Sequence, residues 1–485
     1  STMPRSTPVR WIDGEAPTLS LGPTFGVPWP RGAVKPGAPL AVRGDSKPLP
    51  SQHWTLATWP DGSLKWSAHA LPAGMDQPAT LDVAPGRPTA PKAGVMVREQ
   101  ADMVEIVSGA TRWRIPRSGA VAIAGAWAGD RQVMGPLTLV ASIDDAPENG
   151  RRTQLTGRID RVTVEQKGPV RAVVRIEGIH AGAGRSLLPF TVRLYAYAGG
   201  DHLRIVHSFI FDGDPGKDFV SSLGLVAAVP MAGAPHDRHV RLATTQGHLF
   251  SEAVRPLTGL RRDPGEAARA AQIAGRAVPM DAMADSVRPL LDRIPTWSDF
   301  SLSQLSADGF AIVKRTQAGH AWVDATAGTR ALGLGYVGSP MGGVALAARY
   351  FWQRHPTQID ISDAASDEAR LALWLWSPDA RPMDMRPYRG VLGMEGYDAQ
   401  NEGLAITYED YEPGWDSATG TARTSELTLW ACAATPGADR LAAMAQANAV
   451  PPQLMVEPQR IHAANVFGPW ALPDRSTPMK ARIED

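Results

Sequence analysis

Glycine and proline interrupt this chain at short intervals along most of its length, and this feature constrains the fold more than any other. The 485 residues include 47 Gly and 42 Pro, and neither residue suits the interior of a long helix. The segments between them are short, and many alternate between apolar and polar residues, which is typical of strands joined by turns. The sequence therefore predicts a mainly β protein with few helices.

The first hairpin is expected between residues 56 and 69, where Pro60-Asp-Gly62 supplies the turn. A second hairpin joins residues 104–107 to residues 112–115 through Ser108-Gly-Ala110. Residues 80–98 are rich in Pro, Gly and Ala and are predicted to form a linker. The boundary of a small N-terminal domain is therefore expected near residue 95, so that this domain covers residues 1–95.

Long alternating strands dominate the next part of the chain. Residues 170–177, 191–198 and 202–211 follow one another closely, and strands resume at 308–336 and 371–376. Such runs predict a large antiparallel β-sandwich over residues 96–400. Residues 263–275 are expected to form either a short helix or a mobile insertion, and a helix is otherwise expected only at 439–447. Residues 401–485 are predicted to form a mixed segment that packs on the sandwich.

Charge and cysteine content exclude several classes of protein. Lys plus Arg and Asp plus Glu are equal at 49 each, so no overall field favours nucleic acid or an anionic membrane. The longest apolar runs fall short of the roughly 20 residues that a membrane span needs. The single Cys432 rules out an internal disulfide framework. One cysteine is compatible with export, and the opening Ser1-Thr-Met3 looks processed, so we expect a secreted or periplasmic protein whose leader has been removed.

Two motifs point to ligands at first sight. Gly333-Leu-Gly-Tyr-Val-Gly338 has the dinucleotide spacing, but its surroundings predict strands rather than a βαβ unit. Asp212, Asp214 and Asp218 resemble part of a calcium loop, although no Glu follows at the twelfth position. A polar turn at a strand end is the preferred interpretation, so no cofactor is expected and calcium is the alternative. The chain also lacks GxSxG, HExxH and Walker motifs.

Other segments combine residue types suited to catalysis. His207 lies on a strand face with Leu203, Ile205 and Phe209, so its imidazole is either a core residue or a proton acceptor in a cleft. The segment from Arg349 to His355 contains two arginines, three aromatic residues, an amide and a histidine. The 15 Trp offer flat faces for stacking on sugar rings, or they fill the core.

Four segments in order carry a family resemblance. They are Trp59-Pro-Asp-Gly-Ser-Leu-Lys-Trp66, His207-Ser-Phe-Ile-Phe-Asp-Gly-Asp214, Tyr350-Phe-Trp-Gln-Arg-His-Pro356 and Ala422-Arg-Thr-Ser-Glu-Leu427. Together they resemble the YetA-like, exo-rhamnogalacturonan lyase family over residues 20–470. The resemblance implies a small RIFT-like N-terminal barrel, a central β-sandwich and a C-terminal α/α toroid. The chain ends shortly after Phe467-Gly-Pro-Trp470, where that toroid is expected to begin, so we expect the toroid to be missing.

The chemistry implied by the resemblance is β-elimination on an acidic polysaccharide or oligosaccharide, acting from a chain end. A cation must neutralise the uronate carboxylate, a base must remove a proton and an acid must protonate the leaving oxygen. Arginine suits the first role, and His or Tyr suits the others. The predicted site residues are His207, Arg349, Tyr350, His355, Arg386, Tyr388, Tyr411 and Arg423, with Glu426 orienting one of the cations.

Two alternatives remain open at the level of sequence. A glycoside hydrolase would need two carboxylates at the scissile bond, and one stretch is dense in candidates: Glu395, Glu402, Glu409, Asp410, Glu412 and Asp416. A non-catalytic glycan-binding protein is the other alternative, since the toroid is expected to be missing.

Overall fold

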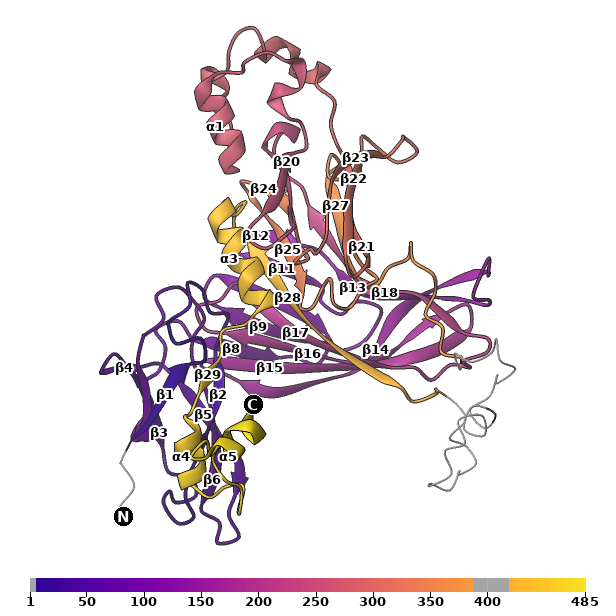
Figure 1. Cartoon of the computed structure of the whole chain (residues 1–485). Coiled ribbons are helices and arrows are strands. Elements are labelled where there is room, and N and C mark those ends of the chain that lie inside the picture. Colours follow the sequence, from indigo (N-terminus) through magenta and orange to yellow (C-terminus); the bar gives the residue numbers. More distant parts are fainter. Residues whose placement is uncertain (1–5, 387–398, 400–417) are drawn as a thin grey trace.

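The structure is a computed structural model, and it describes residues 6–386, 399 and 418–485. Strands dominate it, as the short spacing of Gly and Pro predicted. Figure 1 shows a small N-terminal β domain beside a much larger assembly of strands, with helices confined to the upper lobe and the C-terminal part of the chain. No helix within the described ranges is both long enough and apolar enough to cross a membrane.

The N-terminal domain is a small barrel made of two sheets. Its strands are β1 (Thr7–Trp11), β2 (Thr24–Pro28), β3 (Leu40–Gly44), β4 (Lys47–Leu49), β5 (Gln52–Thr58), β6 (Leu64–Ala70), β7 (Leu81–Pro85) and β29 (Leu454–Met455). One sheet has the order β29-β1-β7-β3-β4 and the other has the order β2-β6-β5. The predicted hairpin joins β5 to β6, and Asp61 Oδ1 in its turn accepts hydrogen bonds from Ser63 N at 2.9 Å and from Ser63 Oγ at 2.6 Å.

The expected linker over residues 80–98 is wrong in its first part. Leu81 and Val83 are buried, and β7 pairs with both β1 and β3 inside the barrel. The apolar–polar alternation of Leu81-Asp-Val83 overrides the breaking effect of the surrounding Pro and Gly. The segment that joins the two domains is therefore confined to residues 86–94, since the next strand begins at Val95.

A five-stranded sheet follows the barrel. Its strands are β8 (Val95–Glu99), β9 (Met103–Ser108), β10 (Thr111–Pro116), β11 (Gly125–Ala128) and β12 (Arg131–Met134). The predicted second hairpin is β9–β10, in which Thr111 lies opposite Ser108. Trp113, Ile106 and Val133 of this sheet belong to the core of the large sandwich, so the small sheet forms one of its layers.

The rest of the central domain is one sheet of 16 strands. They are β13 (Leu137–Asp144), β14 (Arg152–Lys167), β15 (Arg171–Gly182), β16 (Arg185–Tyr197), β17 (His202–Ile210), β18 (Phe219–Pro230), β19 (His239–Ala243), β20 (Leu249–Ala253), β21 (Asp299–Ser306), β22 (Gly309–Arg315), β23 (Val323–Gly328), β24 (Leu334–Ser339), β25 (Gly342–Ala348), β26 (Thr357–Ser362), β27 (Glu368–Trp376) and β28 (Ala422–Cys432). Their order is β20-β19-β24-β25-β28-β17-β16-β15-β14-β13-β18-β27-β26-β21-β22-β23.

This sheet folds over on itself to make the predicted sandwich. Strands β24 and β25 from one half pack against β18 and β27 from the other half. Apolar residues at alternate positions fill the core of the sandwich, as β17 illustrates with buried Leu203, Ile205 and Phe209. The opposite face of β15, β16 and β17 carries polar and aromatic residues, and this face bears the candidate site described below.

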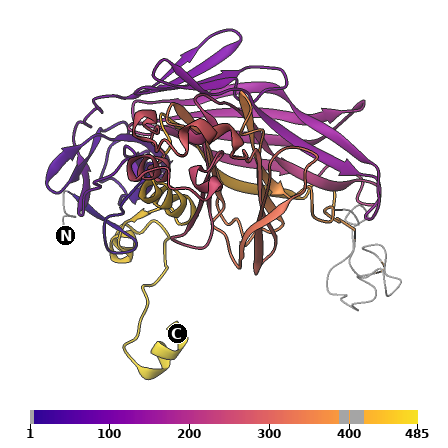
Figure 2. The same ribbon diagram turned by 90° about the horizontal axis from the view of Figure 1, so that it is seen from above.

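Four α-helices lie within the described residues: α1 (Glu266–Ala274), α3 (Ala438–Ala449), α4 (Pro458–Ala463) and α5 (Pro478–Glu484). The first two coincide with the predicted helices. The short helices α4 and α5 were not predicted, although each has Pro at its first position, which is a helix-start signal. Figure 2 shows α5 at the end of an extended segment that leads away from the sheets.

The last part of the chain is divided among three places. β28 lies between β17 and β25 in the large sheet, so the sandwich continues beyond the boundary expected at residue 400. Helix α3 then packs Leu441 and Met444 against Trp430 and Tyr336 on the outer face of that sheet. β29 returns to the barrel and pairs with β1.

Candidate functional site

The loop after β25 is the segment that the sequence singled out for its density of arginines and aromatic residues. Arg349 N donates to Glu426 O at 2.9 Å, and Arg354 N donates to Tyr350 O at 2.9 Å, so the loop is tied to β28 and closed on itself. Tyr350 has a φ of 59°, a left-handed conformation that non-glycine residues rarely adopt. Its side chain is 42% exposed. Such strain at an exposed aromatic residue is typical of functional loops.

Two arginines from different strands converge on one carboxylate. Arg349 Nη1 lies 3.1 Å from Glu426 Oε2, and Arg204 Nη2 of β17 lies 3.4 Å from Glu426 Oε1. Glu426 therefore holds one guanidinium with each oxygen. The Arg349 guanidinium lies 4.7 Å from the centre of the Tyr350 ring, and that of Arg354 lies 5.9 Å from the same centre.

The alternation of arginine and aromatic side chains continues along the sheet toward the barrel. Arg204 lies opposite Tyr195 in the register of β16 and β17, and its guanidinium is 5.3 Å from the Tyr195 ring centre. The guanidinium of Arg171 on β15 lies 5.3 Å from the same Tyr195 ring centre and 4.3 Å from the ring centre of Trp54 in the barrel. These contacts follow from strand pairing, which places alternate residues of neighbouring strands on one face.

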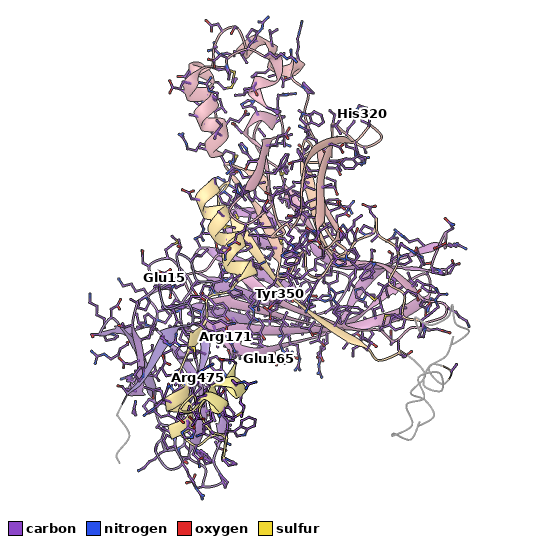
Figure 3. All side chains as sticks on the ribbon, in the orientation of Figure 1. Glu15, Glu165, Arg171, His320, Tyr350 and Arg475 are labelled. Carbon is purple, nitrogen blue, oxygen red and sulfur yellow. The ribbon has the colours of Figure 1, made fainter. Side chains whose placement is uncertain are left out.

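We call this set the arginine–aromatic row. It consists of Trp54, Arg171, Tyr195, Arg204, Glu426, Arg349, Tyr350 and Arg354. Figure 3 labels Arg171, on β15, and Tyr350, in the loop after β25, near its two ends. The row contains four arginines and one carboxylate, although the whole chain has equal numbers of acidic and basic residues. It is therefore a local positive site of the kind that a neutral chain needs to bind an anion.

A cleft of about 200 Å³ opens beside the row, where the barrel, the large sheet and the C-terminal segment meet. Its walls include Arg204, Arg349 and Glu426 from the row, Ser20 from the link between β1 and β2, Thr24 at the start of β2, and Asn448 at the end of α3. His202 Nε2 lies 2.7 Å from Leu21 O and fixes that link against the sheet.

Two polar atoms next to this cleft have no hydrogen-bond partner within the described part of the chain. They are Nε of Arg349 and Nδ2 of Asn448, and both are donors. Asn448 Oδ1 accepts from Thr428 Oγ1 at 2.9 Å, which fixes the amide. Buried donors without partners are costly.

The structure brings together three of the predicted site residues: Arg349, Tyr350 and Glu426. Arg423 lies near them on β28. Burial lowers the pKa of Arg423 from its ordinary value, and the positive charge of Arg354 lowers it further. His355 is exposed at the end of the same loop as Tyr350.

Of the remaining predicted residues other than His207, Arg386 lies elsewhere and the others fall outside the described part of the chain. Arg386 pairs with Asp384 at 2.8 Å and lies over the Phe219 ring at 5.2 Å, away from the row. Tyr388 and Tyr411 fall outside the described residues, as do the six carboxylates from Glu395 to Asp416 that a hydrolase could use. Arg386 therefore does not contribute to the site.

His207 occupies the core side of β17 rather than the cleft. Its side chain is 1% exposed, and neither ring nitrogen has a hydrogen-bond partner in the described part of the structure. Burial lowers the pKa of His207 to about 3, and the neighbouring His180 adds to this effect. The imidazole is therefore neutral and enclosed, which favours the core interpretation over a role as proton acceptor.

The three aspartates of the possible calcium loop are bound by protein groups. Asp218 forms a two-pronged ion pair with Arg185 at 2.8 and 3.0 Å. Asp212 Oδ1 accepts from Leu188 N at 2.7 Å, and Asp214 Oδ1 accepts from Gly216 N at 2.8 Å. Among the residues that the structure describes, no three His, Cys, Asp or Glu side chains are grouped to hold a metal ion.

The glycine motif at residues 333–338 runs into β24, which is followed by β25 rather than by a helix.

The site residues that sequence reasoning missed are Trp54, Arg171, Tyr195, Arg204 and Arg354. A signal for some of them existed, because Arg171, Tyr195 and Arg204 alternate with apolar residues on predicted strands. That pattern is also typical of a solvated strand face, so it did not single them out.

The comparisons with known proteins agree with this architecture. Residues 5–86 match the PcRGLX-like N-terminal RIFT barrel domain, and residues 95–446 match the PcRGLX-like protein central beta sandwich domain. Residues 451–485 match the PcRGLX-like protein C-terminal alpha/alpha toroid domain. This match corrects the expectation that the toroid is missing. The segment that matches the toroid domain includes α4 and α5.

One curated relative is the uncharacterized protein YetA of Bacillus subtilis (strain 168), which is 30% identical over 98% of this chain and 55% of the relative. The chain thus spans about half the length of that protein. Among solved structures, a glycosyl hydrolase family 38 protein from Enterococcus faecalis matches with a TM-score of 0.48 and 9% identity, over 94% of this chain and 48% of the other. A galactose mutarotase-like protein from Clostridium acetobutylicum matches with a TM-score of 0.31 and 8% identity, over 70% of this chain and 98% of the other.

The match to the central sandwich domain covers well over half of the chain, and it is flanked in the correct order by the barrel and toroid matches. This chain therefore belongs to the PcRGLX-like family, which includes YetA.

Proposed function

We propose that this chain is part of a carbohydrate-active enzyme that binds a uronate-containing glycan at the arginine–aromatic row and cleaves it by β-elimination. The observation that carries the proposal is the convergence of Arg204 and Arg349 on Glu426 at the wall of the cleft. Membership of the family supports a glycan substrate, and the local excess of arginine supports an acidic one.

The reaction would proceed at the uronic acid ring. Arginine binding neutralises the carboxylate and makes the proton on C5 more acidic. A base takes that proton. The electron pair of the C5–H bond then forms the double bond between C4 and C5, and the bond from C4 to the glycosidic oxygen breaks. The leaving oxygen then takes a proton from an acid. The product carries an unsaturated ring at its non-reducing end.

The roles follow from the placement of the side chains. Arg349 and Arg204 both line the cleft, so they are the candidates for carboxylate binding. Glu426 holds both guanidinium groups and positions them. Tyr350, exposed between Arg349 and Arg354, is the candidate for proton transfer, and the exposed His355 of the same loop is the alternative partner.

The size of the cleft supports action at a chain end. Pockets for drug-sized ligands typically have volumes of about 300–1,000 Å³, whereas this cleft has a volume of about 200 Å³. It suits a single sugar residue rather than the middle of a long chain. Exo action is therefore the preferred form of the proposal.

Digestion of acidic glycans tests the proposal against its two alternatives. The chain is incubated with rhamnogalacturonan and with other uronate-containing glycans, and products are followed by the ultraviolet absorbance of the unsaturated uronide and by mass spectrometry. Unsaturated ends that disappear in the Arg349→Ala variant support the lyase. Saturated ends would point to a glycoside hydrolase, and binding without any product would point to a glycan-binding protein.

A further inference from the structure

A second cavity lies on the other half of the large sheet, outside the arginine–aromatic row. It has a volume of about 590 Å³ and is lined by residues of β21, β22 and β26 together with Trp322 and Asp379. Trp322 lies on the connection between β22 and β23, the same loop as His320. Figure 3 labels His320 in the upper lobe, well apart from Tyr350. The cavity is therefore a separate site.

The floor of this cavity is a tightly organised polar cluster around Asp360. Asp360 Oδ1 accepts from Ser301 Oγ at 2.7 Å and from Gln358 Nε2 at 2.9 Å, while its Oδ2 accepts from Trp374 Nε1 at 2.9 Å. The same Gln358 Nε2 also donates to Asp379 Oδ2 at 2.8 Å. One buried amide thus fixes two carboxylates at the surface of the groove.

An aromatic platform stands at the side of the cluster. Trp322 is 45% exposed, and the guanidinium of Arg315 lies 4.3 Å from its ring centre. Arg315 is itself held by Asp299 Oδ2 at 2.6 Å. The arginine therefore supports the indole and is neutralised by its own partner, so an open apolar surface remains beside the two fixed carboxylates.

The groove extends past this cluster. Asp379 also borders a neighbouring cavity of about 650 Å³, whose walls include Asp144, Arg152 and Arg381. Arg152 is paired with Asp144 and Arg381 is paired with Glu148, so these arginines are compensated as well. The combined groove has room for more than one sugar residue.

We infer that this groove is a second glycan-binding site and that it takes a neutral oligosaccharide, with a hexopyranose ring stacked on Trp322 and its hydroxyl groups donating to Asp360 and Asp379. Sugar rings present an apolar face that stacks on indole, and carboxylates accept hydrogen bonds from hydroxyls. Each arginine that borders the groove is paired with a carboxylate of its own. The additional carboxylates of Asp360 and Asp379 therefore make the groove acidic. A uronate is therefore repelled here and attracted at the arginine–aromatic row.

The chemistry of Asp360 is consistent with this preference. Burial raises the pKa of Asp360, the nearby Asp379 acts in the same direction, and the three hydrogen bonds oppose both effects. The hydrogen bonds from Ser301, Gln358 and Trp374 hold the carboxylate in a fixed orientation at the groove.

The test measures binding of neutral galacto- and cello-oligosaccharides and of acidic oligogalacturonides to the full chain by calorimetry and ligand-observed NMR. The inference predicts that neutral oligosaccharides bind and that Trp322→Ala weakens their binding at least about tenfold, equivalent to about 1.4 kcal/mol. Asp379→Ala, at an exposed position, should weaken it as well. Trp470→Ala is the matched control, because Trp470 is 74% exposed at the other end of the molecule.

The Arg349→Ala variant separates this inference from the proposed function. Neutral binding should survive in that variant, whereas binding of oligogalacturonides at the row should be lost. The inference is overturned if neutral oligosaccharides do not bind, if Trp322→Ala binds them as the wild type does, or if Arg349→Ala abolishes neutral binding. None of these results would by itself remove the β-elimination proposal.

Discussion

Arg349 and Glu426 are joined twice, once through their side chains at 3.1 Å and once through a backbone hydrogen bond of 2.9 Å from Arg349 N to Glu426 O. The residues are far apart in the sequence, yet β25 and β28 are neighbours in the large sheet. This double link fixes the loop that carries Tyr350 to the strand that carries the central carboxylate. Glu426 thereby positions both the arginines and the loop.

Replacing Glu426 by Gln should misalign Arg349 and Arg204 without changing the shape of the side chain. We expect kcat/KM on a uronate-containing glycan to fall about 10–100-fold, because small errors in position are costly for catalysis. The melting temperature should change little, since the ion pairs are partly exposed. Glu165→Gln is the matched control, because Glu165 also holds two arginines, Arg193 and Arg175, on a partly exposed sheet face. Equal losses in the two variants would contradict the positioning role of Glu426.

Removing only the hydroxyl of Tyr350, as in Tyr350→Phe, should lower kcat by about 10²–10⁴, the usual range for a general acid or base. The ring and its contacts with Arg349 and Arg354 remain in this variant, so substrate affinity should change far less. A variant that keeps wild-type kcat would exclude Tyr350 from proton transfer and leave His355 as the candidate.

The backbone of Tyr350 offers an independent check on the same residue. Because its φ is 59°, glycine fits this position without strain. Tyr350→Gly should therefore abolish turnover while leaving thermal stability unchanged or slightly higher, in contrast to most large-to-small substitutions. A clear drop in melting temperature would show that Tyr350 serves the fold rather than the site.

His207 should behave as a core residue. Truncation to Ala leaves a cavity and should lower the free energy of unfolding by about 2–4 kcal/mol. Replacement by Leu fills the space and removes two unpartnered nitrogens, so it should be neutral or stabilising by about 1–2 kcal/mol. Chemical denaturation measures both values. If His207→Leu stays folded but loses turnover, the core assignment is contradicted.

The buried histidines predict acid sensitivity. Burial lowers the pKa of His69 and His207 to about 3 and that of His180 and His239 to about 4. In the unfolded chain these groups titrate near 6.5, so below that pH the unfolded state binds more protons than the folded state. Their contribution is complete above about pH 6.5 and is lost as pH falls toward 4 and 3. Denaturation at several pH values should show this loss, and it should be shallower in His207→Leu.

Sequence patterns predicted correctly those structural features that depend on residues close together in the chain. The Pro60-Asp-Gly62 turn predicted the β5–β6 hairpin, and the alternation around His207 correctly placed its side chain with Leu203, Ile205 and Phe209. The same alternation could not decide whether that face was core or cleft. The structure decides it, because His207 is 1% exposed and its neighbours Leu203, Ile205 and Phe209 belong to the main core.

The site itself depends on contacts that no local pattern reports. Arg204 meets Glu426 only because β17 pairs with β28, although the two strands are separated by ten other strands in the chain. Arg171 and Tyr195 join the row through the register of β15, β16 and the barrel residue Trp54. Sequence reasoning found residues of the right chemical types in the loop at 349–356 and in β28, but their convergence is a property of the sheet order.

The central claim is that the arginine–aromatic row recognises a carboxylate, and one measurement tests it most directly. The affinity of the chain for a uronate-containing oligosaccharide is compared by calorimetry with its affinity for the same oligosaccharide after chemical reduction of the carboxyl groups. We predict at least about tenfold tighter binding of the acidic form, with the preference lost in Arg349→Ala and kept in Arg193→Ala, a partly exposed arginine that is held by Glu165 outside the row. Equal affinity of the wild-type chain for the acidic and reduced forms would contradict the account.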